Sequence, residues 1–285
     1  MGLEVRGSFA KKQDELLIDW LSDKPALVRL SKVYGQVLID SYLAAPQDYL
    51  FLQSIFGRVI ALDDYNRIPY HADVLLNPNI FGDKVDYRTT ARVIAGRQYV
   101  ILREAFRKEL DKVAVRKQAS RVLVTFGGDD YRKLCPKISQ WLRDEPIRLT
   151  IIAGNDAYAA ALREQLGGDV EVIGYVEADQ MRHQMLNTDI VVSACGQTLH
   201  ELAYLGVPTI GICIDIDQEP NRDAYCDLGF LPARLDWNDA QLEKKVKGVL
   251  QQMENSELRK RISEAGLRSV DGRGVDNIFG QLFLH

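Results

Sequence analysis

The sequence predicts an α/β fold with two domains, each built on a parallel sheet, and three observations support this prediction. From residue 121 onward, short β-rich runs alternate with helical patterns, which is typical of parallel strands joined by crossover helices. The first part of the chain repeats this alternation less regularly. At 285 residues, the chain also exceeds what one hydrophobic core usually organises.

Polar side chains follow each apolar run of the first part. These runs predict three strands, at residues 37–39, 59–62 and 74–76. Because the carboxyl ends of parallel strands meet at one edge of a sheet, we expect the polar residues that follow them to gather there: Asp40, Tyr42, Asp63, Asp64 and Asn77. Carboxylates so placed can position water or bind a sugar, so Asp40, Tyr42 and Asp63 are candidate catalytic residues. Asp and Asn also begin turns and cap helices routinely, which is the alternative interpretation.

A charged segment separates the two halves. Residues 102–107 read as a helix, and residues 108–117 read as a charged, solvated linker. We therefore place the boundary near Ala114. The predicted division is an N-terminal domain at 1–114, a C-terminal domain at 115–268 and a terminal helix at 269–285.

The second half carries the clearer alternation of strands and helices. Its predicted strands are residues 122–126, 148–152, 170–173, 190–192 and 209–212, and its predicted helices are residues 131–142, 157–166, 178–186 and 198–205. A sheet of this kind binds its ligand at the carboxyl ends of the strands. Gly127 and Gly128 lie at such an end, where glycines allow the backbone to approach a phosphate or sugar closely. A tight turn before a helix capped by Asp129 or Asp130 is the alternative.

Residues 190–221 read as a strand, a small-residue turn, a helix and a second strand, with polar groups at both turns. Thr198 is the expected N-cap of the helix, and Glu201 follows three residues later. In one interpretation these two side chains form a capping box. In the other, the free amides of the helix hold a diphosphate while Glu201 accepts hydrogen bonds from a ribose diol. Past the second strand, Gln218 and Asn221 are placed to reach a phosphate or a sugar hydroxyl.

The last part of the chain is expected to be helical. Residues 238–266 read as two helices, and a Gly-rich interruption at 268–275 precedes a final amphipathic helix. A helix after such an interruption can pack across a domain interface. The alternative is an ordinary helix cap.

Composition excludes several classes of protein. The hydrophobic share of 46%, the charged share of 27% and the net charge of −4 give no basic field for nucleic acid. The four cysteines form no CxxC pair, which favours reduced, packed thiols, and no spacing of His, Asp or Glu matches a metal site, so neither a metal nor another cofactor is expected. No apolar stretch approaches the roughly 18 residues that span a bilayer, and no signal peptide is recognised, so a cytoplasmic location without stable membrane insertion is expected.

Taken together, the motifs resemble a known family. The chain is similar to the UDP-sugar hydrolases of pseudaminic acid biosynthesis, which release UDP from a 2,4-diacetamido-2,4,6-trideoxy-β-L-altropyranose, and to related spore coat polysaccharide proteins. The resemblance is carried by VLIDSY (37–42), ALDDYNRIPYHADVLLNPN (61–79), AGRQYVILREAF (95–106), FGGDD (126–130), SACGQTLHELAYLGVPTIGI (193–212), DQEPN (217–221) and VDGRGVDNI (270–278). Part of this set is shared with glycosyltransferases built from two facing Rossmann-like domains.

The resemblance implies a GT-B-like fold in which two Rossmann-like domains face a cleft and the C-terminal domain holds UDP or a UDP-sugar. It places the phosphates on Gly196, Gln197 and Thr198. It places the ribose on Glu201 and the uracil near Tyr175 and Val176. Gln218 and Asn221 would face the diphosphate or the sugar. Neither the sugar nor the oligomeric state follows from the sequence.

The chain departs from the family in one respect. Family members place a histidine in a Gly-x-Gly-His turn right after their first strand, and these 285 residues contain no such turn. We therefore expect an N-terminal domain that lacks its first βα unit, and a protein that binds a UDP-sugar but hydrolyses it slowly or not at all. Omission of that unit would leave a gap in the middle of the sheet, which natural sheets do not easily tolerate. The alternatives are a UDP-sugar-dependent glycosyltransferase and a noncatalytic nucleotide-sugar-binding protein.

Overall fold

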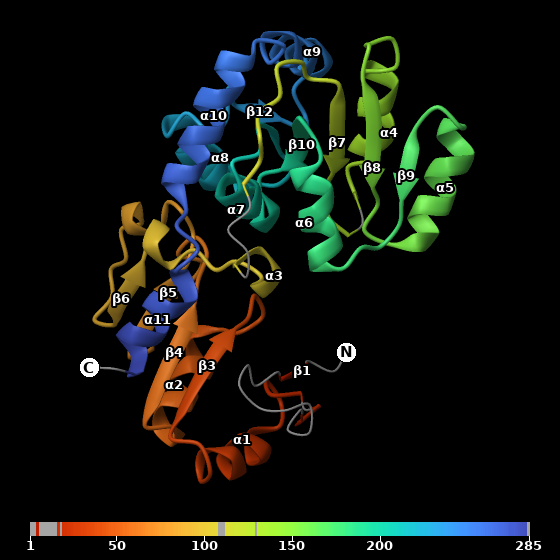
Figure 1. Ribbon diagram of the computed structural model, residues 1–285. Coiled ribbons are helices and arrows are strands. Elements are labelled where there is room, and N and C mark those ends of the chain that lie inside the picture. The colour runs from red at the N-terminus through yellow and green to blue at the C-terminus, as the bar shows by residue number, and fades with distance from the viewer. Residues whose placement is uncertain (1–3, 6–15, 18, 108–111, 129, 284–285) are drawn as a thin grey trace. The chain divides into compact units, whose positions relative to one another are not determined.

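The computed structural model describes residues 4–5, 16–17, 19–107, 112–128 and 130–283, and by contact it divides into two compact units (Figure 1). Met1–Asn77 and Lys84–Ala95 form the N-terminal unit, and Pro78–Asp83 and Gly96–His285 form the C-terminal unit. Each unit contains a parallel sheet, so the predicted α/β fold with two Rossmann-like domains is confirmed. The domain boundary near Ala114 stays a prediction, and residues 108–111 of the predicted linker lie outside the described residues.

The N-terminal unit is a four-stranded parallel sheet in the order β3-β4-β5-β6. Its strands are β3 (Gln36–Asp40), β4 (Arg58–Leu62), β5 (Val74–Asn77) and β6 (Arg92–Ala95). Two helices, α1 (Lys24–Ser31) and α2 (Pro46–Ile55), accompany them, and a short antiparallel pair, β1 (Glu4–Val5) and β2 (Leu16–Leu17), precedes them. Apolar residues of α2, such as Leu52, pack with Val59 and Leu75 in the core of this unit.

The sheet of the N-terminal unit has no gap among its described strands. The interruption that omission of the first unit would cause is not found there, because each of these strands pairs with the next along the chain. Strand β3 instead lies at an edge, where Leu38 keeps 51% of its surface exposed. Strand β6, which the sequence pattern did not reveal, forms the other edge with only Ile94 buried.

The C-terminal unit is a six-stranded parallel sheet in the order β12-β11-β10-β7-β8-β9. Its strands are β7 (Arg121–Thr125), β8 (Arg148–Ile152), β9 (Glu171–Ile173), β10 (Ile190–Ala194), β11 (Thr209–Cys213) and β12 (Leu235–Asp236). The chain runs outward from β7 to one side, then returns to β10 and runs outward to the other side. This is the doubly wound order, and its topological switch point lies between β7 and β10.

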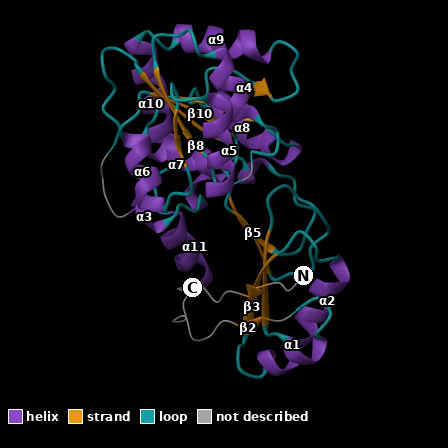
Figure 2. Ribbon diagram, turned by 90° about the vertical axis from the view of Figure 1, so that its right-hand side faces the viewer, coloured by secondary structure: helices purple, strands orange, loops and turns teal. Residues whose placement is uncertain are grey.

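Helices cover both faces of the six-stranded sheet (Figure 2). They are α4 (Leu134–Trp141), α5 (Asp156–Leu166), α6 (Ala178–Leu186), α7 (Gln197–Leu205), α8 (Glu219–Asp227), α9 (Leu242–Gln252) and α10 (Ser256–Ser269). Helix α4 packs with α5 and α9, whereas α7 packs with α6 and α10. The bounds of α4, α5, α6 and α7 lie close to the predicted ones, whereas α8 was not predicted.

Short elements complete the C-terminal unit. They are α3 (Glu104–Arg107), the 3-10 turns η1 (Gly82–Lys84), η2 (Arg97–Tyr99) and η3 (Ile216–Gln218), and the final helix α11 (Gly274–Phe283). The last residue of η1, Lys84, already belongs to the N-terminal unit. Helix α11 contacts η2, where Asn277 donates a 2.8 Å hydrogen bond to the carbonyl of Gln98. The prediction that the final helix crosses a domain interface stays a prediction.

Candidate functional site

Helix α7 begins with backbone amides that no side chain caps. Strand β10 ends at Ala194, and Gly196 is the N-cap residue of α7, without a side-chain acceptor and without an acidic residue in the first turn. Among the residues that the structure describes, no recorded hydrogen bond uses the amides of Gly196, Gln197 or Thr198. The positive end of this helix therefore presents donors without partners, which is the arrangement that binds anions.

The capping-box interpretation of this helix, one of the two that the sequence left open, is wrong. The helix begins at Gln197, so Thr198 lies inside the first turn and is not the N-cap. Glu201 lies a full turn into the helix, and its carboxylate does not reach back to the N-cap amide. Ribose binding, the other interpretation of Glu201, stays a prediction.

Glu201 is instead paired with a cation that the sequence analysis did not single out. Arg103 donates to the two carboxylate oxygens of Glu201, from Nε at 2.6 Å and from Nη2 at 2.8 Å. Burial raises the pKa of Glu201, and the pairing with Arg103 acts against that rise. Arg103 lies within the motif at residues 95–106, but no local pattern connects it to a residue 98 positions away in the chain.

Gly127 and Gly128 lie at the switch point of the sheet, directly after β7. Gly127 has a φ of 80°, and a β-carbon on either glycine would meet no atom within 4 Å. The turn is open on that side, so a ligand can approach its backbone closely. The alternative interpretation of this segment was a turn before a helix capped by Asp129 or Asp130. Asp130 does cap α4, because its carboxylate accepts from the amides of Leu134 and Cys135 at 2.8 Å. Asp129 lies outside the described residues.

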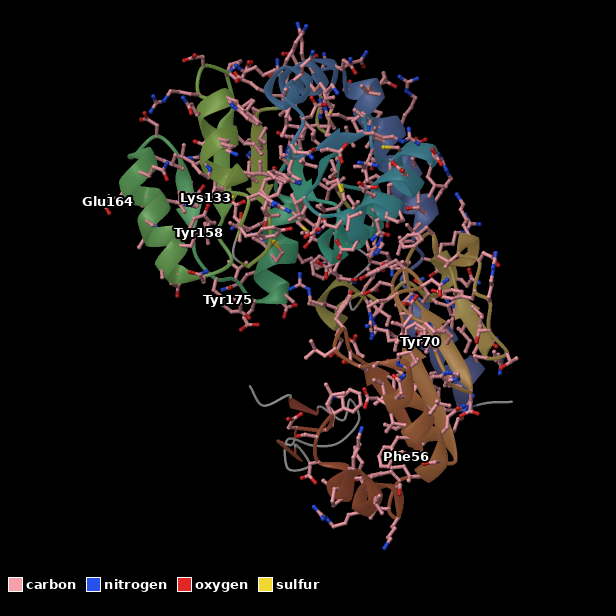
Figure 3. All side chains as sticks on the ribbon, turned by 180° about the vertical axis from the view of Figure 1, so that it is seen from behind. Phe56, Tyr70, Lys133, Tyr158, Glu164 and Tyr175 are labelled. Carbon is pink, nitrogen blue, oxygen red and sulfur yellow. The ribbon has the colours of Figure 1, made fainter. Side chains whose placement is uncertain are left out.

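Two residues that the sequence analysis missed hold this turn in place. A β-carbon on Gly154, which follows β8, would lie 2.1 Å from Cα of Gly128, so only glycine fits there. Asn155 donates to the carbonyl of Gly128 at 3.1 Å and accepts from the amide of Tyr158 at 2.7 Å, which caps α5. Tyr158 in turn donates to Asp130 at 2.7 Å and is labelled in Figure 3.

Gln218 supports the turn before α7 from the neighbouring strand end. Its Oε1 accepts from the amide of Cys195 at 3.1 Å, and its Nε2 would lie 3.4 Å from a β-carbon on Gly196. Asn221, at the start of α8, is 6% exposed, and its Oδ1 has no hydrogen-bond partner among the described residues. Its Nδ2 donates a long bond of 3.4 Å to Asn79. Gln218 therefore lies beside the turn, and Asn221, three residues further along the chain, has a buried oxygen without a hydrogen-bond partner among the described residues.

Tyr175 and Val176, the predicted uracil contacts, line an open hollow of about 440 Å³ between the end of β9 and α6. Ile173, Asp179, Gln180, His183 and Gln184 complete its lining. Tyr175 is 60% exposed and projects from the edge of the C-terminal unit (Figure 3). The volume suits a small ligand, and an exposed aromatic ring offers a face for stacking a base.

Asp63, a predicted catalytic residue, is saturated by hydrogen bonds in the N-terminal unit. Its carboxylate accepts from Tyr70 OH at 2.7 Å, from Tyr87 OH at 2.6 Å and from the amides of Asn66 and Arg67. Tyr70 is labelled in Figure 3. Asp63 is only 3% exposed, so a structural role at the end of β4 explains it fully.

The other polar residues of this edge gather as the sequence pattern indicated. Tyr42 is 55% exposed and donates to Asp64. Asn77 donates to the carbonyl of Asp64 at 3.0 Å. Burial of its carboxyl, and then the charge of Asp64, raise the pKa of Asp40. A carboxyl with a raised pKa and a tyrosine at one strand edge can accept or donate protons, and their catalytic role stays a prediction.

The remaining candidates show no catalytic arrangement. Cys195 is fully buried, and burial raises the pKa of its thiol well above the usual value, which fits the predicted packed thiol. Over the described residues, no group of three or more His, Cys, Asp or Glu side chains is arranged to hold a metal ion. Within the same residues, every helix is too short or too polar to span a membrane.

Residues 121–270 match the family model of the glycosyltransferase family 28 C-terminal domain. Among curated proteins, the chain is 22% identical over 253 residues to the spore coat polysaccharide biosynthesis protein SpsG of Bacillus subtilis, covering 84% of this chain and 74% of SpsG. It is 25% identical over 219 residues to the uncharacterized protein MJ1062 of Methanocaldococcus jannaschii, covering 70% of this chain and 44% of that protein.

Solved structures of known proteins share the fold. MurG of Acinetobacter baumannii superposes with a TM-score of 0.65 at 14% identity, over 99% of this chain and 83% of MurG. The S. aureus MnaA structure with UDP has a TM-score of 0.62 at 11% identity, over 92% of this chain and 80% of that one. The spinosyn rhamnosyltransferase SpnG with its aglycone has a TM-score of 0.60 at 15% identity, over 91% of this chain and 77% of SpnG. At these identities the likeness shows a shared GT-B-like fold.

Proposed function

The chain belongs to the family of the glycosyltransferase family 28 C-terminal domain, and on this premise we propose that its C-terminal unit binds UDP or a UDP-sugar. The diphosphate lies at the first turn of α7, opposite the Gly127–Gly128 turn. The uracil lies in the hollow beside Tyr175 and Val176.

One observation carries this proposal: the amides of Gly196, Gln197 and Thr198 have no described hydrogen-bond partner at the topological switch point. Orphan amides at a helix N-terminus favour a negatively charged ligand because the helix dipole and the N–H groups act together. The buried Oδ1 of Asn221, which has no hydrogen-bond partner among the described residues, is the proposed acceptor for a sugar or ribose hydroxyl.

The reaction that this arrangement supports is the release of UDP. A water oxygen bonds to the anomeric carbon, the bond from that carbon to the phosphate oxygen breaks, and the electron pair leaves with UDP. Donors at the first turn of α7 stabilise the charge that develops on the departing diphosphate. The attacking water gives its proton to a general base, and Asp40, a carboxyl whose pKa is raised by burial, stays the predicted residue for that role.

The substrate proposed for this hydrolysis is a UDP-activated diacetamido-trideoxy hexose of surface polysaccharide biosynthesis. The similarity to a protein of spore coat polysaccharide biosynthesis supports this assignment. Incubation of the full chain with this UDP-sugar, followed by NMR, measures UDP and free sugar together. Equal amounts of UDP and free sugar support hydrolysis, and an intact UDP-sugar that remains bound supports the noncatalytic alternative.

A glycosyltransferase is the second candidate, because the matched family is named for sugar transfer. A transferase uses the same nucleotide site but passes the sugar to an acceptor hydroxyl. In the same NMR assay, with a candidate acceptor present, release of UDP with a new glycosidic linkage and without free sugar favours transfer.

Replacement of Gly128 by leucine is expected to weaken UDP binding at least tenfold, which corresponds to about 1.4 kcal/mol. Because a β-carbon at Gly128 meets no protein atom within 4 Å, the leucine side chain fills the space proposed for the ligand without disturbing the fold. Isothermal titration calorimetry with UDP measures this effect.

Gly168→Leu is the matched control, since a β-carbon on Gly168 also meets no atom within 4 Å. Gly168 lies in the loop before β9, at the amino end of that strand, whereas Gly128 lies after the carboxyl end of β7. The control variant is expected to bind UDP like the wild-type chain. Equal affinity of the Gly128→Leu variant and the wild-type chain for UDP contradicts the proposed location of the ligand.

A further inference from the structure

Two side chains of the turn after β7 reach the segment after β11, which lies two strands away in the sheet. Tyr131 OH lies 3.0 Å from the carbonyl oxygen of Ile214 and 2.9 Å from Oδ2 of Asp215, and these two acceptors share its single proton. Arg132 donates from Nε to the same carbonyl of Ile214 at 3.1 Å. We call Tyr131 and Arg132 the loop clamp.

Arg132 is fixed by aromatic rings as well as by this hydrogen bond. Its central guanidinium carbon lies 3.8 Å from the ring centre of Trp237, which follows β12, and 4.6 Å from that of Tyr131. A guanidinium in such a position is attracted by the ring electrons. The amide of Trp237 in turn donates to the carbonyl of Cys213, the last residue of β11, at 2.9 Å. The loop clamp therefore joins the loops that follow β7, β11 and β12.

The backbone is strained on both sides of the loop clamp. Asp130 has a φ of 38°, and Lys133, which is labelled in Figure 3, has a φ of 52°. Left-handed conformations are unfavourable for residues with a β-carbon and persist where surrounding contacts fix them. Because such strain gathers at ligand-binding sites, the turn between these residues is a candidate for a role in binding.

The segment that the loop clamp holds carries Gln218, a predicted ligand of the diphosphate or the sugar. Asp215 caps the η3 turn, because its Oδ1 accepts from the amide of Ile216 at 2.8 Å, and Gln218 is the last residue of that turn. Oε1 of Gln218 accepts from the amide of Cys195 at 3.1 Å, and the amide of Ile214 lies 3.5 Å from the same oxygen. A continuous series of hydrogen bonds thus runs from the loop clamp through Gln218 to the turn before α7.

Gln218 presents a donor beside that turn. Its Nε2 would lie 3.4 Å from a β-carbon on Gly196, and no hydrogen bond recorded for the described residues uses this nitrogen. The amide group cannot turn over without losing the bond between Oε1 and the amide of Cys195. Nε2 therefore stays directed toward the free amides of α7.

Two explanations account for the loop clamp. In the first, it only stabilises the C-terminal unit, as any contact between loops does. In the second, it holds Gln218 in the orientation that a ligand needs. The strained turn and the series of hydrogen bonds that ends at Gln218 favour the second explanation.

We infer that Tyr131 and Arg132 are positioning residues of the nucleotide-sugar site, which fix the Ile214–Gln218 segment so that Nε2 of Gln218 donates to the diphosphate or the sugar. The inference rests on the proposed function of this site. A side chain that is already held in its binding orientation loses less conformational freedom when the ligand arrives, so its hydrogen bond contributes more to affinity.

The test compares the wild-type chain with the double variant Tyr131→Phe/Arg132→Met, which removes the donors of the loop clamp and keeps side chains of similar size. Calorimetry measures the affinity of the full chain for uridine and for a phosphonate analogue of the proposed UDP-sugar, in which a methylene group replaces the oxygen between sugar and phosphate and prevents hydrolysis. Positioning predicts about tenfold weaker binding of the analogue. It predicts an unchanged affinity for uridine, which lacks the groups that Gln218 contacts.

A parallel loss of affinity for both ligands shows a merely structural role and overturns the inference, as does an unchanged affinity for the analogue. If the wild-type chain binds neither the analogue nor UDP, the proposed function fails and the inference fails with it. If the wild-type chain and the double variant bind the analogue equally well, only the inference fails.

Two further variants test how specific the effect is. Arg132→Lys keeps a cation for the ring of Trp237 and leaves Tyr131 in place, so it is expected to bind the analogue like the wild-type chain. Arg121→Met is the matched control, because Arg121 donates from Nη1 to the carbonyl of Asn187 at 3.2 Å, at the amino end of β7 and away from the proposed site. A loss of affinity in Arg121→Met as large as in the double variant contradicts the inference.

A second measurement needs no ligand. The NMR signals of the side-chain amide of Gln218 are expected to shift in Tyr131→Phe, which lacks only one hydroxyl group, because the segment that carries Gln218 is then held less firmly. The same signals are expected to stay in place in Arg121→Met. Unmoved signals in Tyr131→Phe overturn the inference, even if the double variant does not fold.

Discussion

Replacement of Gly154 by alanine is expected to displace the Gly127–Gly128 turn and to lower the free energy of unfolding by about 3 kcal/mol, the upper end of the usual cost of overpacking. The new β-carbon would lie 2.1 Å from Cα of Gly128, 2.5 Å from its carbonyl oxygen and 2.6 Å from the carbonyl oxygen of Gly127. These are backbone atoms, so no side-chain rotation relieves the overlap. UDP affinity is expected to fall with stability, because the displaced turn borders the proposed site.

Urea denaturation followed by circular dichroism measures the loss of stability, and calorimetry measures the loss of affinity. Gly168→Ala serves as the control, since its β-carbon meets nothing within 4 Å. A Gly154→Ala variant that matches the wild-type chain in both stability and UDP affinity contradicts the account of this turn.

The second large effect is a loss of stability in mild acid that originates at His200. His200 lies inside α7 with 1% of its surface exposed, its Nδ1 is 2.7 Å from Tyr225 OH, and burial lowers its pKa to about 4. Above pH 6.5 the ring is neutral in both the folded and the unfolded chain. Between pH 6.5 and 4 the unfolded chain binds a proton that the folded chain does not, so stability falls as the pH falls.

The expected contribution of this single group at pH 4.5, relative to pH 7, is a loss of about 2.5 kcal/mol. Other acidic groups titrate in the same range, so the measurement compares the wild-type chain with His200→Asn, which keeps a polar atom near Tyr225 but does not titrate. The wild-type chain is expected to lose more stability between pH 7 and pH 4.5 than the variant does. Equal losses in the two proteins show that His200 is not held neutral by burial.

Local patterns in the sequence predict most of the strands and helices of the C-terminal unit. The helix predicted at residues 178–186 matches α6, and the strand predicted at 148–152 matches β8. Both segments are predicted from local apolar residues, a signal that depends only on neighbouring residues. Strand β6 was missed: it lies at a sheet edge, buries only Ile94 and has a short apolar run at residues 93–95 between Arg92 and Gly96.

The contacts of Glu201 show what local patterns cannot provide. Two interpretations were open for this residue, a capping box and a ribose ligand, and both considered only residues close to it in the chain or a ligand. The structure pairs it with Arg103, 98 positions away. Contacts between distant segments depend on the fold as a whole, and the same reason explains why the support of the glycine turn by Gly154 was not predicted.

The hydrogen bonds of Asp63 also depend on contacts that local sequence patterns do not reveal. The sequence pattern placed Asp63 correctly at a strand end, beside other polar residues. It did not reveal that Tyr70 and Tyr87 donate to its carboxylate, whose oxygens are already occupied by hydrogen bonds within the unit. Among the three predicted catalytic residues, Asp40 and Tyr42 are therefore the better candidates.

The central claim is that the first-turn amides of α7 bind the diphosphate of a nucleotide. The most direct test records the backbone amide NMR signals of the full chain during titrations with UDP and with uridine. The signals of Gly196, Gln197 and Thr198 are expected to shift with UDP in a saturable manner and to shift much less with uridine, which lacks phosphates. Saturable UDP binding that leaves these three signals unmoved, or the absence of UDP binding, contradicts the claim.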